Sequence, residues 1–210
     1  MGVIVPIVEG DGEVEALPNL LIRLLHRHSC FDLFVARPKN AHGCGNLTTP
    51  GGIERFVRLA LFEPQCEGIL VLLDADDSCA CSIANGLAKR IEALNPQKPV
   101  AFIAAKCEYE AWFLASLPTI TGKLLDGRPG LKQGLTYPDD RVESLVGVKG
   151  WLSRNFQGGR IYKETLDQLP MTRFIDFDMA LPKSRSLRRL EHAVIELIEN
   201  RNIARFISPF

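Results

Sequence analysis

The chain has 210 residues, of which 46% are apolar and 24% charged, and its 25 basic and 25 acidic side chains balance to a formal charge of zero. This length suits one domain with a substantial core, and the composition excludes an extended disordered protein. Zero net charge excludes binding of polyanions through overall charge alone. The apolar runs are too short to cross a bilayer, and the first residues lack the pattern of a signal peptide, so we expect a cytoplasmic protein without membrane contact.

Short apolar runs alternate with helical patterns in the first half of the chain. Residues 3–8 are apolar and rich in β-branched side chains, which predicts a strand that Gly10 and Gly12 end. Leucines then recur at three- and four-residue spacing as far as Leu25, which predicts a helix. We expect further strands at residues 31–36, 68–73 and 100–104, helices at 54–62 and 83–94, and a polar loop at 37–52.

The second half of the chain is less regular. We expect a helix at residues 110–117, a glycine-rich loop or lid at 119–137, a helix at 141–155 and an amphipathic helix at 187–200. The apolar C-terminal segment, residues 203–210, suits docking either on a partner or on the core. The expected organisation is an α/β core over residues 1–117 and a loop-rich, mainly helical C-terminal extension over 118–210, packed together as one compact unit.

The fold class follows from the predicted strands. They are continuous apolar runs separated by helical patterns, which indicates an α/β fold with a mainly parallel sheet and helices on both faces. Right-handed crossovers bring the carboxyl ends of such strands to one edge of the sheet. Ligands of open α/β sheets bind at that edge.

Several carboxylates lie just past the predicted strands and should meet at this edge. They are Glu9, Glu13, Asp74, Asp76 and Glu108. Like charges a few ångströms apart raise one another's pKa unless a cation or a proton neutralises them. Hard oxygen ligands of this kind suit Mg²⁺ or Mn²⁺. The pattern therefore predicts a divalent metal site.

Each feature of this edge also has a simpler explanation. An aspartate after a strand is a common helix N-cap, and the acids can pair with arginine or lysine. The turn Gly10, Asp11, Gly12 can hold a phosphate at a helix N-terminus, although the glycine pattern and the lysine of known phosphate loops are absent. Basic residues concentrate in the last third of the chain, where they suit either a phosphodiester or a solvated helix face.

The cysteines and tryptophans leave similar alternatives. The six cysteines include no CxxC pair and lie mostly in apolar surroundings, which favours reduced, structural thiols. Zinc-ligand residue types occur at His26, His28, Cys30, His42 and Cys44. Their spacing matches no common zinc pattern. Trp112 and Trp151 suit either the stacking of bases or the filling of the core.

Two sets of motifs resemble known families. Residues 9–13 followed by 74–76 resemble the TOPRIM domain, the metal-binding module of topoisomerases, bacterial primases and OLD-type nucleases. Residues 108–115, 149–152 and 162–168 resemble a bacterial TOPRIM-like family known as domain of unknown function 4276. The late motifs are specific to that family, whereas the early acids are shared with the wider superfamily.

The TOPRIM resemblance implies roles for the early acids. Glu9 would be a general acid or base, and Asp74 with Asp76 would hold magnesium. Glu9 would also contact the metal. Glu13 matches the second glutamate of nuclease-like members and would be catalytic, helping to hold a second ion.

The family-specific motifs imply further residues and a function. Glu108 would be a metal ligand, while Lys149 and Tyr162 would contact substrate phosphate. The implied activity is Mg²⁺- or Mn²⁺-dependent hydrolysis of nucleic-acid phosphodiesters, which needs no protein nucleophile. The resemblance also implies a bacterial defence system with an ATPase partner. The alternative is a non-catalytic metal- or nucleic-acid-binding subunit of a larger complex.

Overall fold

The centre of the molecule is a parallel β-sheet. The computed structural model describes residues 2–75, 78–201 and 203–207. The sheet contains β1 (Gly2–Val8), β2 (Leu33–Val35), β3 (Lys39–Asn40), β4 (Cys66–Ala75), β5 (Val100–Lys106) and β8 (Phe206–Ile207). Their order is β2-β1-β4-β5-β8, with β3 pairing the end of β1, and each pairing is parallel.

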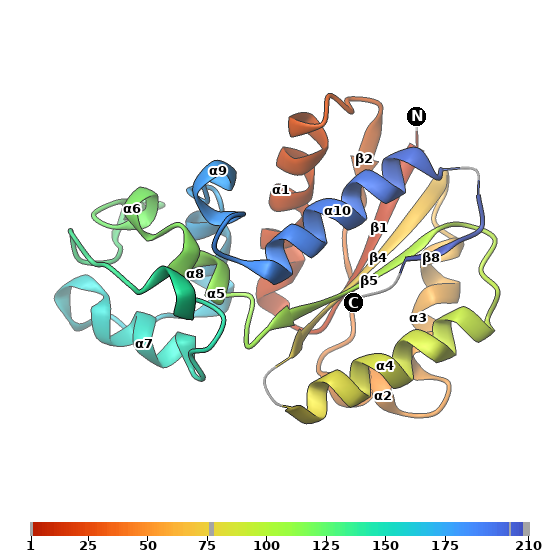
Figure 1. Cartoon of the computed structure of the whole chain (residues 1–210), viewed down its shortest axis with the longest axis horizontal. Helices are drawn as coiled ribbons and strands as arrows, with labels where there is room; N and C mark the ends of the chain where they lie inside the picture. The colour runs from red at the N-terminus through yellow and green to blue at the C-terminus, as the bar shows by residue number, and fades with distance from the viewer. Residues whose placement is uncertain (1, 76–77, 202, 208–210) are drawn as a thin grey trace.

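Helices and two short antiparallel strands complete the described part of the fold (Figure 1). The helices of the sheet layers are α1 (Asp11–Arg27), α2 (Cys44–Thr48), α3 (Gly52–Leu61), α4 (Ser78–Ala93) and α10 (Arg185–Glu199). The others are α5 (Ala111–Ala115), α6 (Leu117–Ile120), α7 (Val148–Asn155), α8 (Glu164–Thr172) and α9 (Phe177–Ala180), with 3₁₀ turns η1 (Asp139–Arg141) and η2 (Gln157–Gly159). β6 (Leu124–Leu125) and β7 (Arg128–Pro129) form a hairpin.

Helices cover both faces of the sheet. On β4, Leu70 and Leu72 pack with α1 and α10, whereas the alternate residues Val71 and Leu73 pack with α3 and α4. Because successive side chains of a strand point to opposite faces, continuous apolar runs supply both layers. The expected α/β class, with a mainly parallel sheet covered on both faces, is confirmed.

The second half of the chain gathers beyond one end of the sheet and then returns to it. Figure 1 shows α5 to α9 together at the left, from where α10 runs back across the sheet. α10 packs on β5, and β8 then pairs with the start of β5, where Phe206 lies opposite Val100. Phe206 and Ile207 therefore join the core sheet of their own chain, although they belong to the C-terminal part, whereas Ile203 is exposed. A division at residue 117 stays a prediction.

Two predicted helices are too long, the helix expected at 83–94 begins earlier, at Ser78, and α2, α8 and α9 were not predicted. The helix expected at residues 110–117 ends at Ala115, because Ser116 has a non-helical backbone and Pro118 lies in the first turn of the next helix. The helix expected at 141–155 begins only at Val148, since Gly147 has a φ of 75°. A left-handed glycine interrupts a helix at little steric cost.

The packing settles the alternatives for Trp112. The Trp112 side chain is fully buried, and its indole Nε1 donates a hydrogen bond of 2.8 Å to Ser186 Oγ. It fills the core between α5 and α10 and is not accessible to a base. Within the described chain, each helix is too short or too polar to span a membrane.

Candidate functional site

A pocket of about 420 Å³ lies at the carboxyl edge of β1 and β4. Its lining includes Glu9, Gly10, Asp11, Glu13, His42, Gly43, Asp74, Lys149, Glu164 and Thr165. Glu9, Glu13 and Asp74 come from the sheet edge and the first turn of α1, as the sequence predicted. Lys149 and Glu164 reach the pocket from α7 and α8. Acidic side chains outnumber this one lysine among the lining residues.

Glu9 connects the sheet edge to the loop after β3. Its Oε1 accepts a hydrogen bond of 3.1 Å from the backbone N–H of Cys44, the first residue of α2. The carbonyl of Glu9 accepts a second bond, of 2.8 Å, from the N–H of Gly43. These bonds hold the loop against the end of β1 and form one wall of the pocket.

Glu13 has a capping role in addition to its place in the pocket. Its Oε2 accepts a hydrogen bond of 2.9 Å from the N–H of Gly10, which satisfies a donor at the start of α1. Its Oε1 accepts a bond of 3.2 Å from Gln168 Nε2 in α8. The side chain is only 7% exposed. Glu13 is therefore held firmly between α1 and α8.

Asp74 lies at the end of β4 and links it to the segment after β5. Its Oδ1 accepts a hydrogen bond of 3.0 Å from the N–H of Tyr109, and its Oδ2 lies 3.9 Å from Lys149 Nζ. Asp76, the second aspartate of the predicted pair, lies outside the described residues.

Lys149 brings an ammonium group to the pocket, and both its backbone N–H and its Nζ contact carboxylates. Its backbone N–H, in the first turn of α7, donates a bond of 3.1 Å to Oε2 of Glu108. Its Nζ lies 2.5 Å from Glu164 Oε1, 3.9 Å from Glu110 Oε2 and 3.9 Å from the Asp74 carboxylate. Burial alone would lower the pKa of this ammonium, but the surrounding carboxyl groups outweigh burial and raise it. Lys149 is therefore charged.

Glu110 lies in the protein interior behind the pocket. It is fully buried, and burial raises its pKa to about 8, although Lys149 and Tyr162 counteract part of this rise. Its Oε1 accepts a bond of 2.7 Å from the Tyr162 hydroxyl. The structure thus places Tyr162, a predicted phosphate contact, inside the protein with 7% exposure, and its hydroxyl is directed at Glu110.

α8 supplies residues that the sequence prediction missed: Glu164 lines the pocket, and Gln168 contacts the pocket residue Glu13. Glu164 and Gln168 are four residues apart and therefore lie on one face of α8, which packs on α1. Gly12 makes this approach close, because a Cβ there would overlap Gln168 Oε1 and contact Glu164 Cβ. Both residues belong to the family-specific stretch 162–168, so a helix prediction for that stretch would have identified the face.

The donor chemistry of the pocket fits a hard divalent cation, since Glu9, Glu13 and Asp74 supply carboxylate oxygens from three elements. Among the described residues, however, no three acidic, histidine or cysteine side chains already form a group that could hold a metal ion. Asp76, the predicted second aspartate ligand, is not among those residues. Glu108 is not part of the pocket lining, and its role in the described structure is to anchor α7.

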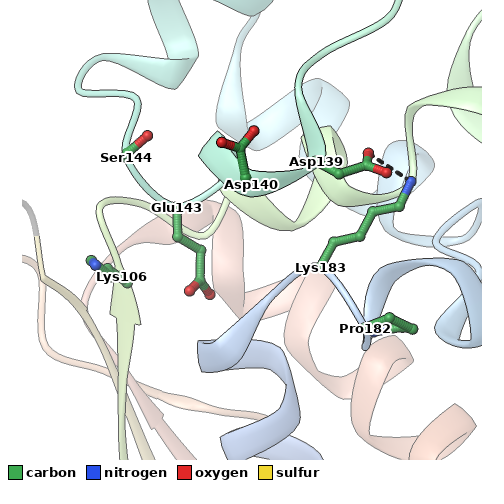
Figure 2. A pocket seen from close by; sticks show the side chains of 7 residues that line it. All are labelled: Lys106, Asp139, Asp140, Glu143, Ser144, Pro182 and Lys183. Carbon is green, nitrogen blue, oxygen red and sulfur yellow. Dashed lines mark ion pairs between the residues drawn. The ribbon is translucent and has the colours of Figure 1, made fainter.

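A second pocket, of about 540 Å³, has a different character (Figure 2). It is lined by Lys106, Asp139, Asp140, Glu143, Ser144, Pro182 and Lys183. Asp139 pairs with Lys183 at 2.9 Å. Glu143 Oε1 accepts bonds of 2.7 Å from both Ser184 Oγ and the N–H of Ser186, so this carboxylate caps α10. These contacts stabilise the fold at the start of α10.

The comparisons with known proteins agree with the family resemblance of the late motifs. A search of curated proteins and a search of solved structures each found no match to this chain. A family model matches residues 8–195, which include the pocket residues from Glu9 to Glu164. The chain belongs to the family described as Domain of unknown function (DUF4276).

Proposed function

We propose that this protein is a TOPRIM-like hydrolase that cleaves nucleic-acid phosphodiesters with Mg²⁺ or Mn²⁺. The observation that carries the proposal is the convergence of Glu9, Glu13 and Asp74 in one pocket at the carboxyl edge of a parallel sheet. Lys149 adds a charged donor to the same pocket. Carboxylates that can hold a divalent cation, beside a cationic side chain, suit metal-dependent phosphodiester hydrolysis.

Each residue has a role in this proposal. Glu9, Asp74 and Asp76 would hold the ion, and a divalent cation there would neutralise charge on the phosphate and favour ionisation of an attacking water. Glu9 and Glu13 would take and return protons. Lys149 would contact a substrate phosphate. We do not assign that contact to Tyr162, because its hydroxyl would first have to leave Glu110.

The proposed partners follow from the same resemblance. Nucleic acid would be the substrate, and an ATPase subunit would act with the protein in a bacterial defence system. Because the net charge of the chain is zero, a nucleic acid would be attracted by the basic residues concentrated in the last third of the chain and by the bound cation.

A second candidate function has an observation in its favour. Lys149 Nζ lies within 4 Å of Asp74, Glu110 and Glu164, so a side chain already compensates part of the acidic charge. This arrangement also suits a non-catalytic binding subunit in which the acids hold the C-terminal helices to the sheet. Metal-dependent cleavage distinguishes the two candidates, because a non-catalytic subunit that binds a metal would still cleave no nucleic acid.

The test is a calorimetric titration with Mn²⁺ and Mg²⁺, followed by a cleavage assay on single- and double-stranded DNA and RNA. Asp74→Asn is the informative variant, because asparagine keeps an acceptor for the N–H of Tyr109 while the charge is removed. We expect saturable binding and cleavage by the wild type, and loss of both in the variant. The exposed Glu15→Gln is the matched control. Full cleavage by Asp74→Asn would refute the metal site.

A further inference from the structure

Lys149 is held unequally by the carboxyl groups around it. Its Nζ is 2.5 Å from Glu164 Oε1 but 3.9 Å from both Asp74 Oδ2 and Glu110 Oε2. Only the first distance is that of a charge-assisted hydrogen bond. The Glu164 side chain is 38% exposed and that of Asp74 17%, so the close contact is made at the mouth of the pocket and not at its floor.

The backbone positions of both partners are fixed by neighbouring elements. Glu164 is the first residue of α8, where the helix dipole favours a negative charge. α8 is seated against the first turn of α1 at Gly12, whose missing Cβ leaves room for Glu164 and Gln168. The N–H of Lys149 is tied to Glu108. The ion pair between Lys149 and Glu164 therefore joins the first turns of α7 and α8, and neighbouring elements hold both turns in place.

Without Glu164, the flexible Lys149 side chain would settle where the remaining negative charge attracts it. The carboxylate of Asp74 lies 3.9 Å from Lys149 Nζ. The buried Oε2 atom of Glu110, which has no hydrogen-bond partner within the described residues, lies at the same distance and adds negative charge only where Glu110 is ionised. Coulomb attraction grows as the separation falls, and it grows more in a partly buried pocket than in water. The ammonium would therefore move inwards and compete with any other cation for the acids.

We propose that Glu164 is a positioning residue that holds the Lys149 ammonium at the pocket mouth, where it faces substrate, and so keeps it from occupying the cation site beside Asp74. This role rests on the proposed metal-dependent function and adds a residue to it. Glu164 does not bind the metal itself in this scheme. Its effect on the metal passes through Lys149.

A double-mutant cycle tests this role through Mn²⁺ affinity, measured by calorimetry on the full chain. The proteins are the wild type, Glu164→Gln, Lys149→Gln, the double variant and the control Glu15→Gln. We expect Glu164→Gln to weaken Mn²⁺ binding by about tenfold and Lys149→Gln to strengthen it. In the Lys149→Gln background, Glu164→Gln should leave the affinity unchanged. Urea unfolding of each variant confirms that it is folded.

Each other outcome has a definite meaning. If Glu164→Gln weakens Mn²⁺ binding equally in the wild type and in the Lys149→Gln background, Glu164 binds the metal directly. That result would overturn the positioning role. Unchanged affinity in Glu164→Gln would overturn it as well. Absence of Mn²⁺ binding in the wild type would overturn both this role and the metal site. If the expected cycle is found but the wild type cleaves no nucleic acid, only the nuclease activity is refuted.

Discussion

Replacement of Glu110 by glutamine removes a titratable group from the interior with little change of shape. Glu110 is fully buried behind the pocket and accepts a hydrogen bond from Tyr162. Burial raises its pKa to about 8 from an ordinary value of 4.5. Glutamine keeps an acceptor for Tyr162 and is neutral at every pH. The variant therefore isolates the effect of ionising this one carboxyl group.

The sign and size of the effect follow from proton linkage. The folded state holds the proton of Glu110 more tightly than the unfolded state, so this contribution to stability is fully present below pH 4.5 and is lost as pH rises through about 8. Each pH unit in that window costs about 1.4 kcal/mol. The loss is about 3 kcal/mol at pH 7 and about 5 kcal/mol above pH 8, which is a large part of the stability of a typical domain.

The assay is urea unfolding of the wild type and Glu110→Gln at closely spaced values between pH 4 and pH 9. The quantity of interest is the difference between their free energies of unfolding, because other titrating groups cancel in it. We expect this difference to be constant up to about pH 4.5, then to rise in favour of the variant by about 1.4 kcal/mol per pH unit, and to level off above about pH 8.

A difference that stays flat across the whole range would refute the reasoning, since it would mean that Glu110 ionises alike in the folded and unfolded states. A difference that falls with pH would show that Lys149 stabilises the ionised carboxylate more than burial opposes it. Glu15→Gln is the control, because Glu15 is exposed on α1 and the same substitution there leaves the buried Glu110 in place.

Three further substitutions test the packing around the site by urea unfolding. Gly12→Ala should destabilise the protein by about 1–3 kcal/mol, because the added Cβ overlaps Gln168; unchanged stability would show that α8 can move away. Asp167→Asn should lower the free energy of unfolding by about 2–3 kcal/mol, since the carboxylate is fully buried and accepts hydrogen bonds of 3.1 and 2.7 Å from Arg160. A smaller loss would mean that water replaces these hydrogen bonds. Arg90→Ala should lower the free energy of unfolding by about 1–2 kcal/mol, because the hydrogen bonds of Arg90 to α2 and α3 are lost; unchanged stability would show that these bonds do not stabilise the fold.

The fold class could be predicted because its signals are local. Continuous apolar runs such as residues 68–73 indicate strands covered on both sides, and the structure places successive residues of β4 in the two opposite layers. The carboxylates at the ends of β1 and β4 could be located for the same reason, since parallel strands end at one edge. Glu9 and Asp74 do line one pocket.

The less regular second half was harder to predict. Ser116 ends α5, Pro118 lies in the first turn of α6 and Gly147 precedes α7, and their effects depend on the backbone conformation that each adopts in the fold. α8 has a weakly apolar sequence and is stabilised mainly by packing on α1. Without that helix, Glu164 and Gln168 had no assigned face and could not be placed beside Glu13.

The sequence by itself determined the alternation of strands and helices and the acidic edge, because both depend on spacings of a few residues. Only the tertiary structure decided which charges meet there. Lys149 and Glu164 follow Asp74 by many residues, and their approach depends on how α7 and α8 pack, which no local period encodes. The pKa of Glu110 likewise depends on complete burial, because desolvation arises only when distant segments close around a group.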